Sequence, residues 1–303
     1  MTIRPTLRQL HYLCVLAQKG SFRGAAEACF VSQSTLSSGI KQLEDSLQIS
    51  LVDRGSPQFL LTSAGETVLE RAQILLRDVD DLVASVQQSE SLLSGKFRLG
   101  IIPSIGPFLL PRALPSLRKA YPDLRLYLRE SLTRDLLTDL RAGRLDAAVL
   151  ALPYRMDDLC IHVFGRDRFQ IAVPKGHDLC TKTMVAKTDL REETLILLED
   201  GHCLRDHILA SLKRGLNEGD DVHATSLITI VQMVANGLGV TLLPELAVRA
   251  GLANGLDLKL LPMERHMEGK EAERELALVW RPHSALEQNC TPLAEHLAQF
   301  VGV

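Results

Sequence analysis

The chain has 303 residues, 46% of them hydrophobic and 23% charged, and this length and composition fit about two ordinary globular domains. Its formal net charge of −3 argues against nucleic acid or membrane binding by the whole surface, so one segment must meet any such partner. No apolar run is long enough to span a membrane, and no secretory signal is visible, so we expect a cytoplasmic protein without membrane contact. The six cysteines lack the spacing of metal ligands, so we expect no metal and no cofactor.

Residues 1–62 predict three short helices. Apolar residues at helical spacing form the first, which ends at Gly20. Ser21 can cap a second helix, and Ser32 begins a third that runs to about Leu47. The exposed face of the third helix is polar and nearly uncharged, which suits the reading of DNA bases by amides and hydroxyls. Taken alone, this helix is better explained as the solvated face of a small helical bundle.

Residues 63–91 predict one long helix with a heptad seam. Apolar residues recur along it at alternating steps of four and three, at Val68, Ala72, Leu75, Val79, Leu82 and Val86. A seam of this length is buried most simply against a second copy of the chain, which gives a symmetric homodimer. The alternative is that the seam packs against the C-terminal part of its own chain.

From Gly95 onward the pattern changes to short strand-like runs that are separated by helical stretches. The runs are KFRLGIIP, LRLYLRE, LDAAVLAL, FQIAVP, TLILLE, VTLLP and ELALVW. This alternation predicts α/β layers with parallel sheets.

The segment TLILLEDGHCLRDHILASL places Cys203 where a buried strand turns into a helix. A thiol at a helix N-terminus lies at the positive end of the helix dipole, and His202 and Arg205 add cationic character, so we expect the thiolate to be favoured. Thiolates react with peroxides and disulfides and bind metals. The alternative is a small buried hydrophobic residue in a turn, which is the commoner role of an isolated intracellular cysteine.

The stretch AQKGSFRGAAEACFVSQSTLSSGIKQLEDSLQISLVDR resembles the winged helix-turn-helix of LysR-type transcriptional regulators, and SLITIVQMVANGLGVTLLPE is typical of their effector module. The resemblance implies an α+β multidomain protein with a winged helix-turn-helix domain over 1–62, a linker and dimerisation helix over 63–94 and an α/β effector domain over 95–303. The effector domain is then expected to have two Rossmann-like subdomains around a cleft, as in periplasmic binding proteins: subdomain I at about 95–167 plus 274–303, and subdomain II at about 168–273.

In this family the recognition helix enters the major groove of DNA. The resemblance therefore implies DNA contacts by Ser32, Gln33, Ser34, Thr35, Ser38 and Lys41, with Arg54 in the wing. The wing sequence RGSPQFLLT has fewer basic residues than the family pattern, so we expect its contact to be weak. Residues 1–62 have a net charge of +2, which is the sign that DNA binding needs. The implied partners are double-stranded promoter DNA, further copies in a homodimer and homotetramer, and RNA polymerase if the protein is an activator.

Within the family, the motifs IIPSIGPFLLPRALPSL, YLRESLTRDLL and EDGHCLRD resemble the subgroup that senses hydrogen peroxide. This resemblance implies that Cys203 is the peroxidatic cysteine of an activator of oxidative-stress genes, and that His202, Thr133, Ser104 and Arg274 form its peroxide pocket. Ser104 replaces a usual threonine but keeps the hydroxyl. As an alternative, Ser104 and Thr133 cap local turns.

The largest departure from that subgroup is Leu212, which lies where the resolving cysteine is usual, nine residues after Cys203. Without the usual disulfide, an oxidised Cys203 must persist as a sulfenic acid, pair with another cysteine such as Cys180, or be capped by a small thiol such as glutathione. One alternative function is a LysR-type regulator that answers a small-molecule ligand, and another is a thiol peroxidase-type enzyme. Residues 1–91 disfavour the enzyme.

Overall fold

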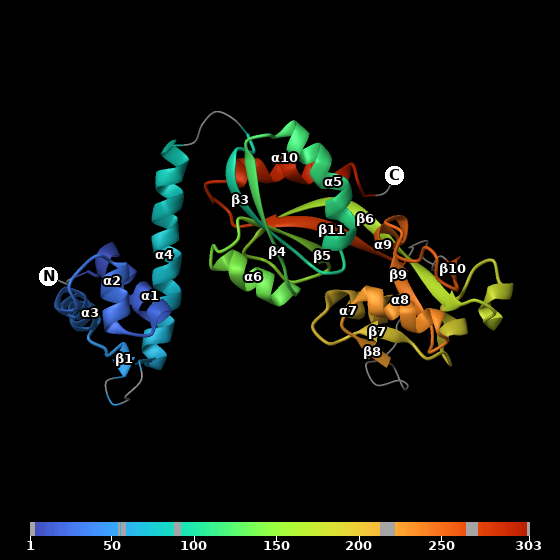
Figure 1. Ribbon diagram of the computed structural model, residues 1–303, viewed down its shortest axis with the longest axis horizontal. Helices are drawn as coiled ribbons and strands as arrows, with labels where there is room; N and C mark the ends of the chain where they lie inside the picture. Colours follow the sequence, from blue (N-terminus) through green and yellow to red (C-terminus); the bar gives the residue numbers. More distant parts are fainter. Residues whose placement is uncertain are drawn as a thin grey trace. The chain divides into compact units, whose positions relative to one another are not determined.

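The computed structural model describes residues 4–53, 55, 59–87, 92–212, 222–264 and 272–301. Two positions named from the sequence lie outside this description: Arg54 in the wing, and the side chain of Val86 in the heptad seam. The chain divides into a smaller unit that is essentially Met1–Gln88 and a larger unit that is essentially Ser89–Val303 (Figure 1). The finer domain boundaries stay predictions.

The smaller unit contains helices whose ends follow local sequence signals. Its elements are α1 (Leu7–Lys19), α2 (Phe22–Ala28), α3 (Gln33–Leu47) and the antiparallel strands β1 (Val52–Asp53) and β2 (Leu60–Leu61). Gly20 ends α1 in the left-handed conformation, with φ 64°. The hydroxyls of Ser21 and Ser32 accept hydrogen bonds from backbone amides at the starts of α2 and α3. The three helices predicted over residues 1–62 are confirmed.

The long helix predicted next is α4 (Ser63–Gln87). Its first half packs within the smaller unit, because Ala72 is buried in the core of that unit and Val68 packs against the same core. Further along α4, Leu75 and Leu82 are 50% and 64% exposed. The expectation that the whole seam needs a partner is therefore wrong for its first half, whereas its second half presents apolar side chains to solvent.

The larger unit is built on a seven-stranded sheet with the order β10-β6-β11-β5-β3-β4, in which β9 also pairs with β6. The strands are β3 (Gly95–Ile101), β4 (Leu124–Glu130), β5 (Ala147–Leu152), β6 (Cys160–Pro174), β9 (Thr241–Pro244), β10 (Leu258–Pro262) and β11 (Glu273–Trp280). β3 is parallel to β4 and β5, but β11 is antiparallel to β5 and β6, and β6 is antiparallel to β9 and β10. The expectation of parallel sheets therefore holds for only part of this sheet.

The strand β6 joins two halves of the larger unit, because its first part pairs with β11 and its last part, from Phe169, pairs with β9 and β10. In the first half, α5 (Gly106–Ala120) and α10 (Glu287–Ala298) cover one face of the sheet and α6 (Thr133–Arg141) lies on the other (Figure 1). The second half adds the parallel strands β7 (Ile196–Leu198) and β8 (Val222–Ala224), with α7 (Cys203–Leu212), α8 (Leu227–Ala235), α9 (Glu245–Arg249) and the 3-10 helices η1 (Asp178–Thr181) and η2 (Lys187–Leu190).

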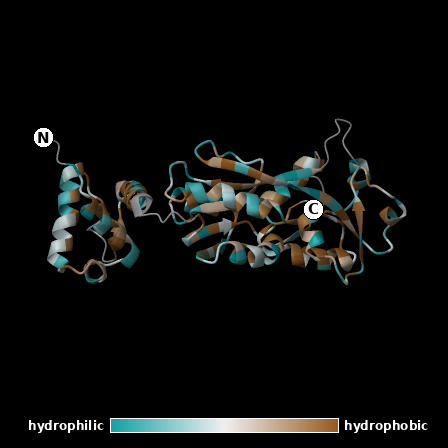
Figure 2. Cartoon of the chain, turned by 90° about the horizontal axis from the view of Figure 1, so that it is seen from above, coloured by the Kyte–Doolittle hydropathy of each residue, from teal (hydrophilic) through white to brown (hydrophobic). Residues whose placement is uncertain are grey.

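One continuous cluster of buried hydrophobic residues joins the two halves of the larger unit. Figure 2 shows hydrophobic residues, in brown, running through this unit, with hydrophilic residues, in teal, along its helices. Cys203 belongs to the buried cluster, so the fold places this thiol in the interior.

Candidate functional site

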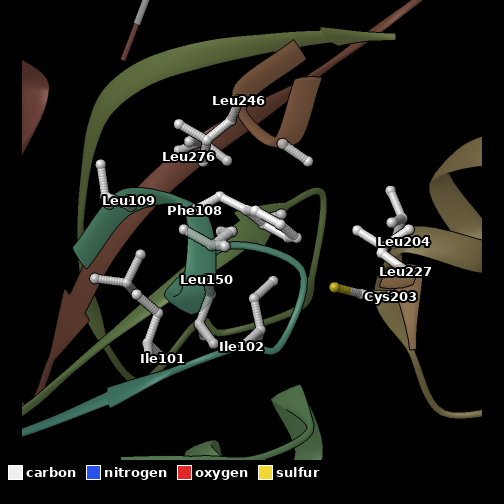
Figure 3. Packing of buried hydrophobic residues seen from close by; sticks show 14 of the residues in the cluster. Ile101, Ile102, Phe108, Leu109, Leu150, Cys203, Leu204, Leu227, Leu246 and Leu276 are labelled. Atoms are coloured by element: carbon white, nitrogen blue, oxygen red, sulfur yellow. The ribbon is translucent and has the colours of Figure 1, made fainter. Parts of the chain in front are cut away.

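Cys203 is the first residue of α7 and follows the buried strand β7 after a short turn. Gly201 in this turn has φ 95°, a left-handed conformation that favours glycine. The Cys203 residue is only 7% exposed. Figure 3 shows its sulfur pointing away from Leu204 and toward the segment that carries Ile102. Cys203 thus lies where the sequence places it, at a turn from strand to helix.

Cys203 lines a small pocket with residues from the segment after β3, from the start of α6 and from the turn before α7. The lining residues are Ile102, Pro103, Ser104, Leu132, Thr133, Gly201, His202, Cys203 and Leu204. The space for the centre of a water-sized molecule is about 10 Å³, close to what a single water needs. The structure therefore brings Cys203 together with three of the four residues predicted for its peroxide pocket, Ser104, Thr133 and His202.

The fourth predicted pocket residue, Arg274, is not in the pocket wall but forms hydrogen bonds with Ser104, which is. It is 1% exposed on β11, opposite Asp167 on β6, and its Nε and Nη2 donate to Asp167 Oδ2 at 3.0 and 2.9 Å. Nη1 donates to Ser104 Oγ at 2.8 Å, and Nη2 donates to the Ser104 carbonyl at 3.0 Å. Because Ser104 Oγ accepts this bond, its own O–H is left to donate elsewhere. Sequence reasoning missed Asp167, which fixes Arg274.

Thr133 supplies a second hydroxyl at the start of α6 and is 2% exposed. Among the described residues, its Oγ1 has no hydrogen-bond partner of good geometry, yet it lies near enough to the Cys203 thiol to lower the pKa of that thiol. A buried hydroxyl without a partner costs about 1–3 kcal/mol. A small polar molecule in the pocket would satisfy it.

The protonation of Cys203 differs from the sequence expectation. Burial raises the pKa of the Cys203 thiol, and the Thr133 hydroxyl and the Arg274 charge only partly oppose this effect. Burial also lowers the pKa of His202, which leaves the ring neutral near pH 7. Arg205 Nη1 lies 2.6 Å from Asp200 Oδ1. The positive charge that lowers the pKa of Cys203 therefore comes from Arg274, and not from His202 or Arg205 as the sequence suggested.

A further buried histidine, His207, lies one turn after Cys203 on α7 and was not singled out from the sequence. Burial and the nearby Arg274 charge lower the pKa of His207 to about 4, although a hydrogen bond to the backbone of Pro153 opposes them. Its Nδ1 has no partner among the described residues. The only sequence signal for His207 is its spacing of four residues from Cys203, which puts both on one side of a helix.

The structure does not bring Cys180 to Cys203. Cys180 lies in η1, where its Sγ donates to the Pro174 carbonyl at 3.5 Å and its own carbonyl accepts from Lys259 of β10 at 2.7 Å. Figure 1 shows β10 and α7 at opposite ends of this half of the unit. Leu212, at the end of α7, packs against the hydrophobic core.

The described side chains predicted to contact DNA lie at the N-cap of α3 and along its first nine residues. All six described candidates are exposed: Ser32, Gln33, Ser34, Thr35, Ser38 and Lys41. Ser32 Oγ forms hydrogen bonds with Ser34 Oγ at 2.9 Å and with Thr35 Oγ1 at 2.7 Å, which orders the first turn. Arg54, the seventh candidate, lies outside the described residues.

The described residues contain neither a membrane-spanning helix nor a metal-binding cluster. No helix in them is long and apolar enough to cross a membrane. Nor do they group three or more histidine, cysteine or acidic side chains that could hold a metal ion.

Comparison with known proteins identifies the family. Residues 7–66 match the bacterial regulatory helix-turn-helix protein of the lysR family, and residues 90–302 match the LysR substrate binding domain. The chain is 38% identical over 304 residues to the hydrogen peroxide-inducible genes activator of Dickeya chrysanthemi, with 97% of this chain and 95% of that protein covered. It is also 38% identical over 288 residues to the HTH-type transcriptional regulator EstR of Acinetobacter baylyi, with 95% and 94% covered.

A solved structure of a full-length OxyR variant from Pseudomonas aeruginosa is similar over 98% of this chain and 95% of that one, with a TM-score of 0.77 and 32% identity. The two family matches cover most of the chain and coincide with the helix-turn-helix and the α/β unit. The chain therefore belongs to the LysR family of bacterial transcriptional regulators and is related to OxyR over its full length.

Proposed function

We propose that this LysR-family regulator senses hydrogen peroxide in the cytoplasm through oxidation of Cys203 and activates genes of the oxidative-stress response. The observation that carries the proposal is a pocket of about 10 Å³ whose wall holds the Cys203 thiol, the unpartnered Thr133 hydroxyl and the Ser104 hydroxyl. The family consists of transcription regulators and not of enzymes, and its helix-turn-helix implies DNA binding. The name of the Dickeya relative, a hydrogen peroxide-inducible genes activator, supports peroxide as the signal.

The proposed reaction is a two-electron oxidation of the thiol. The Cys203 thiolate attacks one peroxide oxygen, an S–O bond forms and the O–O bond breaks. The hydroxide that leaves takes up the proton lost by the thiol, so the products are the Cys203 sulfenic acid and water. Ser104 Oγ accepts a hydrogen bond from Arg274, which leaves its O–H free for the proposed donation to the peroxide, and Thr133 favours the thiolate by lowering the pKa of Cys203.

The buried position of Cys203 is proposed to make the site selective for small oxidants over bulky ones. Because burial raises the pKa of the thiol, only a small fraction is thiolate, and Arg274 and Thr133 preserve that fraction. A pocket with room for about one water-sized molecule admits hydrogen peroxide more readily than a bulky oxidant.

Oxidation is then proposed to act as a switch because it turns a buried thiol into a more polar sulfenic acid. The Cys203 sulfur belongs to the apolar core, so we propose that its new oxygen favours a shift or repacking of α7. We propose that Leu212 occupies the place of the resolving cysteine. Nine residues of helix rise by about 13 Å, so even a cysteine there would need α7 to unwind before a disulfide could form.

The sulfenic acid is proposed to persist or to be capped by glutathione. Capture by Cys180 is disfavoured, because Cys180 is held near β10 at the other end of this half. A free thiol from solution needs only access to the oxidised sulfur after α7 has moved.

The regulator is proposed to act as a homodimer through the second half of the α4 seam, and dimers are proposed to pair into homotetramers. The exposed Leu75 and Leu82 support a partner there, because a coiled coil buries the apolar seam of one helix against the seam of another. A dimer presents two copies of α3 to promoter DNA, and an activator bound there is proposed to contact RNA polymerase.

The second candidate function is a LysR-type regulator that responds to a small-molecule ligand and has lost the redox switch. Two observations favour it: the pKa of Cys203 is raised, and the identity to EstR, 38%, equals the identity to the peroxide-inducible activator. On this alternative Cys203 is a packing residue and peroxide has no effect on transcription.

A reporter experiment separates the two functions. Transcription from a promoter bound by the regulator is measured with and without a low dose of hydrogen peroxide, for the wild type and for Cys203→Ser. The proposed function predicts induction that Cys203→Ser abolishes and that the control variant Cys180→Ser retains. Equal induction in wild type and Cys203→Ser, or no induction in either, would support the ligand-responsive alternative.

A further inference from the structure

The smaller unit has an exposed arginine that faces the same groove as the DNA-reading helix. The groove is lined from α1 by Thr6, Arg8, Gln9 and Tyr12, and from α3 by Ser34, Thr35, Ser38, Gly39 and Gln42. Three of the predicted DNA contacts, Ser34, Thr35 and Ser38, therefore border the groove that Arg8 borders. We propose that Arg8 is a further DNA-binding residue, which contacts a phosphate of the duplex that α3 enters.

The Arg8 side chain is ordered before any DNA binds. Its Nε donates a 2.7 Å hydrogen bond to the Tyr12 hydroxyl oxygen, and its guanidinium carbon lies 5.5 Å from the centre of the Tyr12 ring. Tyr12 is itself 5% exposed and belongs to the core of the unit, so it is a firm anchor. An arginine held in this way loses less side-chain entropy on binding than a free one.

The remaining donors of Arg8 are directed to no partner within the described residues. Its Nε is engaged by Tyr12, whereas Nη1 and Nη2 donate no hydrogen bond in that part of the chain, and the residue is exposed. Two parallel N–H groups of a guanidinium match two oxygens of a phosphate. A phosphate is favoured over a base, because α3 enters the major groove and neighbouring elements of such folds lie along the DNA backbone.

Gly39 on α3 makes this arrangement sterically allowed. A Cβ at residue 39 would lie 2.7 and 2.9 Å from two ring carbons of Tyr12, so the ring can lie this close to α3 only because the position has no side chain. A glycine inside a helix costs about 1 kcal/mol relative to alanine. The close packing of Tyr12 on α3, and with it the position of Arg8, is what this glycine allows.

The DNA-binding segment has only a weak positive charge, to which Arg8 contributes. Residues 1–62 have a net charge of only +2, and Lys41 is the one cation among the described α3 candidates. A preordered Arg8 adds one phosphate contact beside it. The proposal depends on DNA binding by the helix-turn-helix and is independent of peroxide sensing.

The test is duplex binding by the full-length protein at several salt concentrations. The probes are two fluorescein-labelled duplexes of roughly 30 base pairs and unrelated sequence, because a phosphate contact acts on any sequence. Arg8→Ala is expected to weaken binding to both by about eightfold near 0.1 M salt and to reduce the salt slope by about 1. Arg118→Ala, which removes the same charge from the exposed end of α5, is the matched control and is expected to change neither.

Two conservative variants keep the test decisive if Arg8→Ala perturbs the fold. Arg8→Lys should restore the salt slope but only part of the affinity, because lysine keeps the charge without the bidentate geometry. Tyr12→Phe should weaken binding about two- to threefold at unchanged salt slope, because it keeps the charge but loses the ordering oxygen. The proposal is overturned if Arg8→Ala binds like Arg118→Ala, or if its loss differs between the two duplexes, which would indicate a base contact.

Discussion

Arg274 Nη1 and Ser104 Oγ form a 2.8 Å hydrogen bond that ties a buried ion pair to the wall of the Cys203 pocket. The ion pair joins Arg274 to Asp167 across β11 and β6, with 0% and 1% of the side chains exposed. β6 is also the strand that passes between the two halves of the larger unit. A change at the pocket is therefore linked by direct contacts to the strand shared by both halves.

The first prediction concerns this ion pair. Arg274→Gln leaves the Asp167 carboxylate buried without its partner, so we expect the larger unit to lose about 3–5 kcal/mol of stability. The only tryptophan of the chain, Trp280, is buried on β11, so its fluorescence during urea unfolding reports on this unit alone. Asp167→Asn in the same molecule should recover much of the loss. Unfolding of Arg274→Gln at the wild-type urea concentration would contradict the role assigned to the pair.

The second prediction separates function from stability at Thr133. Thr133→Val keeps the shape but removes a hydroxyl that has no partner in the described structure, so stability should stay equal or rise by about 1 kcal/mol. The same change should slow oxidation of Cys203 by about tenfold, because it removes a group that favours the thiolate. Thr133→Ser, which keeps the hydroxyl, should oxidise at nearly the wild-type rate. A marked loss of stability in Thr133→Val would indicate a structural hydrogen bond instead.

The third prediction is a pH dependence from His207. The pKa of His207 is lowered to about 4 in the folded protein from an ordinary value of 6.5, so between these values the unfolded chain binds a proton that the folded chain does not. Protonation of His207 therefore favours the unfolded chain, and the free energy of unfolding falls by about 2 kcal/mol between pH 7 and pH 5. His207→Gln should lose less stability over this range, as measured by Trp280 fluorescence in urea. The control His223→Gln, at an exposed position, should keep the wild-type slope; an unchanged slope in His207→Gln would refute the assignment.

The fourth prediction concerns the turn between α2 and α3. Phe30 has φ 55° and is 96% exposed, so a bulky residue occupies a left-handed conformation without packing in return. Asparagine adopts this conformation more easily, and Phe30→Asn should stabilise the smaller unit by about 1 kcal/mol. Some amides of α2 and α3 exchange their hydrogens only when the whole smaller unit unfolds, and the exchange of these amides should slow about fivefold. Phe30→Ala, which does not relieve the conformation, should show little change, and equal exchange in both variants would count against the argument.

Features that depend on neighbouring residues were predictable from the sequence. Ser21 and Ser32 cap the helices that they precede, and Gly20 ends α1 in the left-handed conformation, because each signal acts within one helical turn. Each of the seven strand-like runs contains a strand. The strands β8 and β10 were missed, because Val222–Ala224 is very short and Leu258–Pro262 carries a lysine and a proline.

Features that depend on distant residues were predictable only through resemblance to the family, or not at all. Family resemblance named Ser104, Thr133 and Arg274, but the sequence gives no sign that Arg274 reaches Ser104 over 170 positions or that Asp167 neutralises it. The expected low pKa of Cys203 failed for a related reason. Local spacing shows the helix start but not how deeply the core buries the thiol.

The most direct test of peroxide sensing is the rate at which Cys203 is oxidised in the reduced full-length protein. Intact-mass and peptide-mass measurements after a low dose of hydrogen peroxide, taken over time, give this rate for each of the six cysteines. We predict one added oxygen at Cys203, or one glutathione when glutathione is present, at least about 100-fold faster than at the other five. Oxidation of Cys203 no faster than that of Cys180 would contradict the proposed sensor and would direct attention to a ligand of the effector domain.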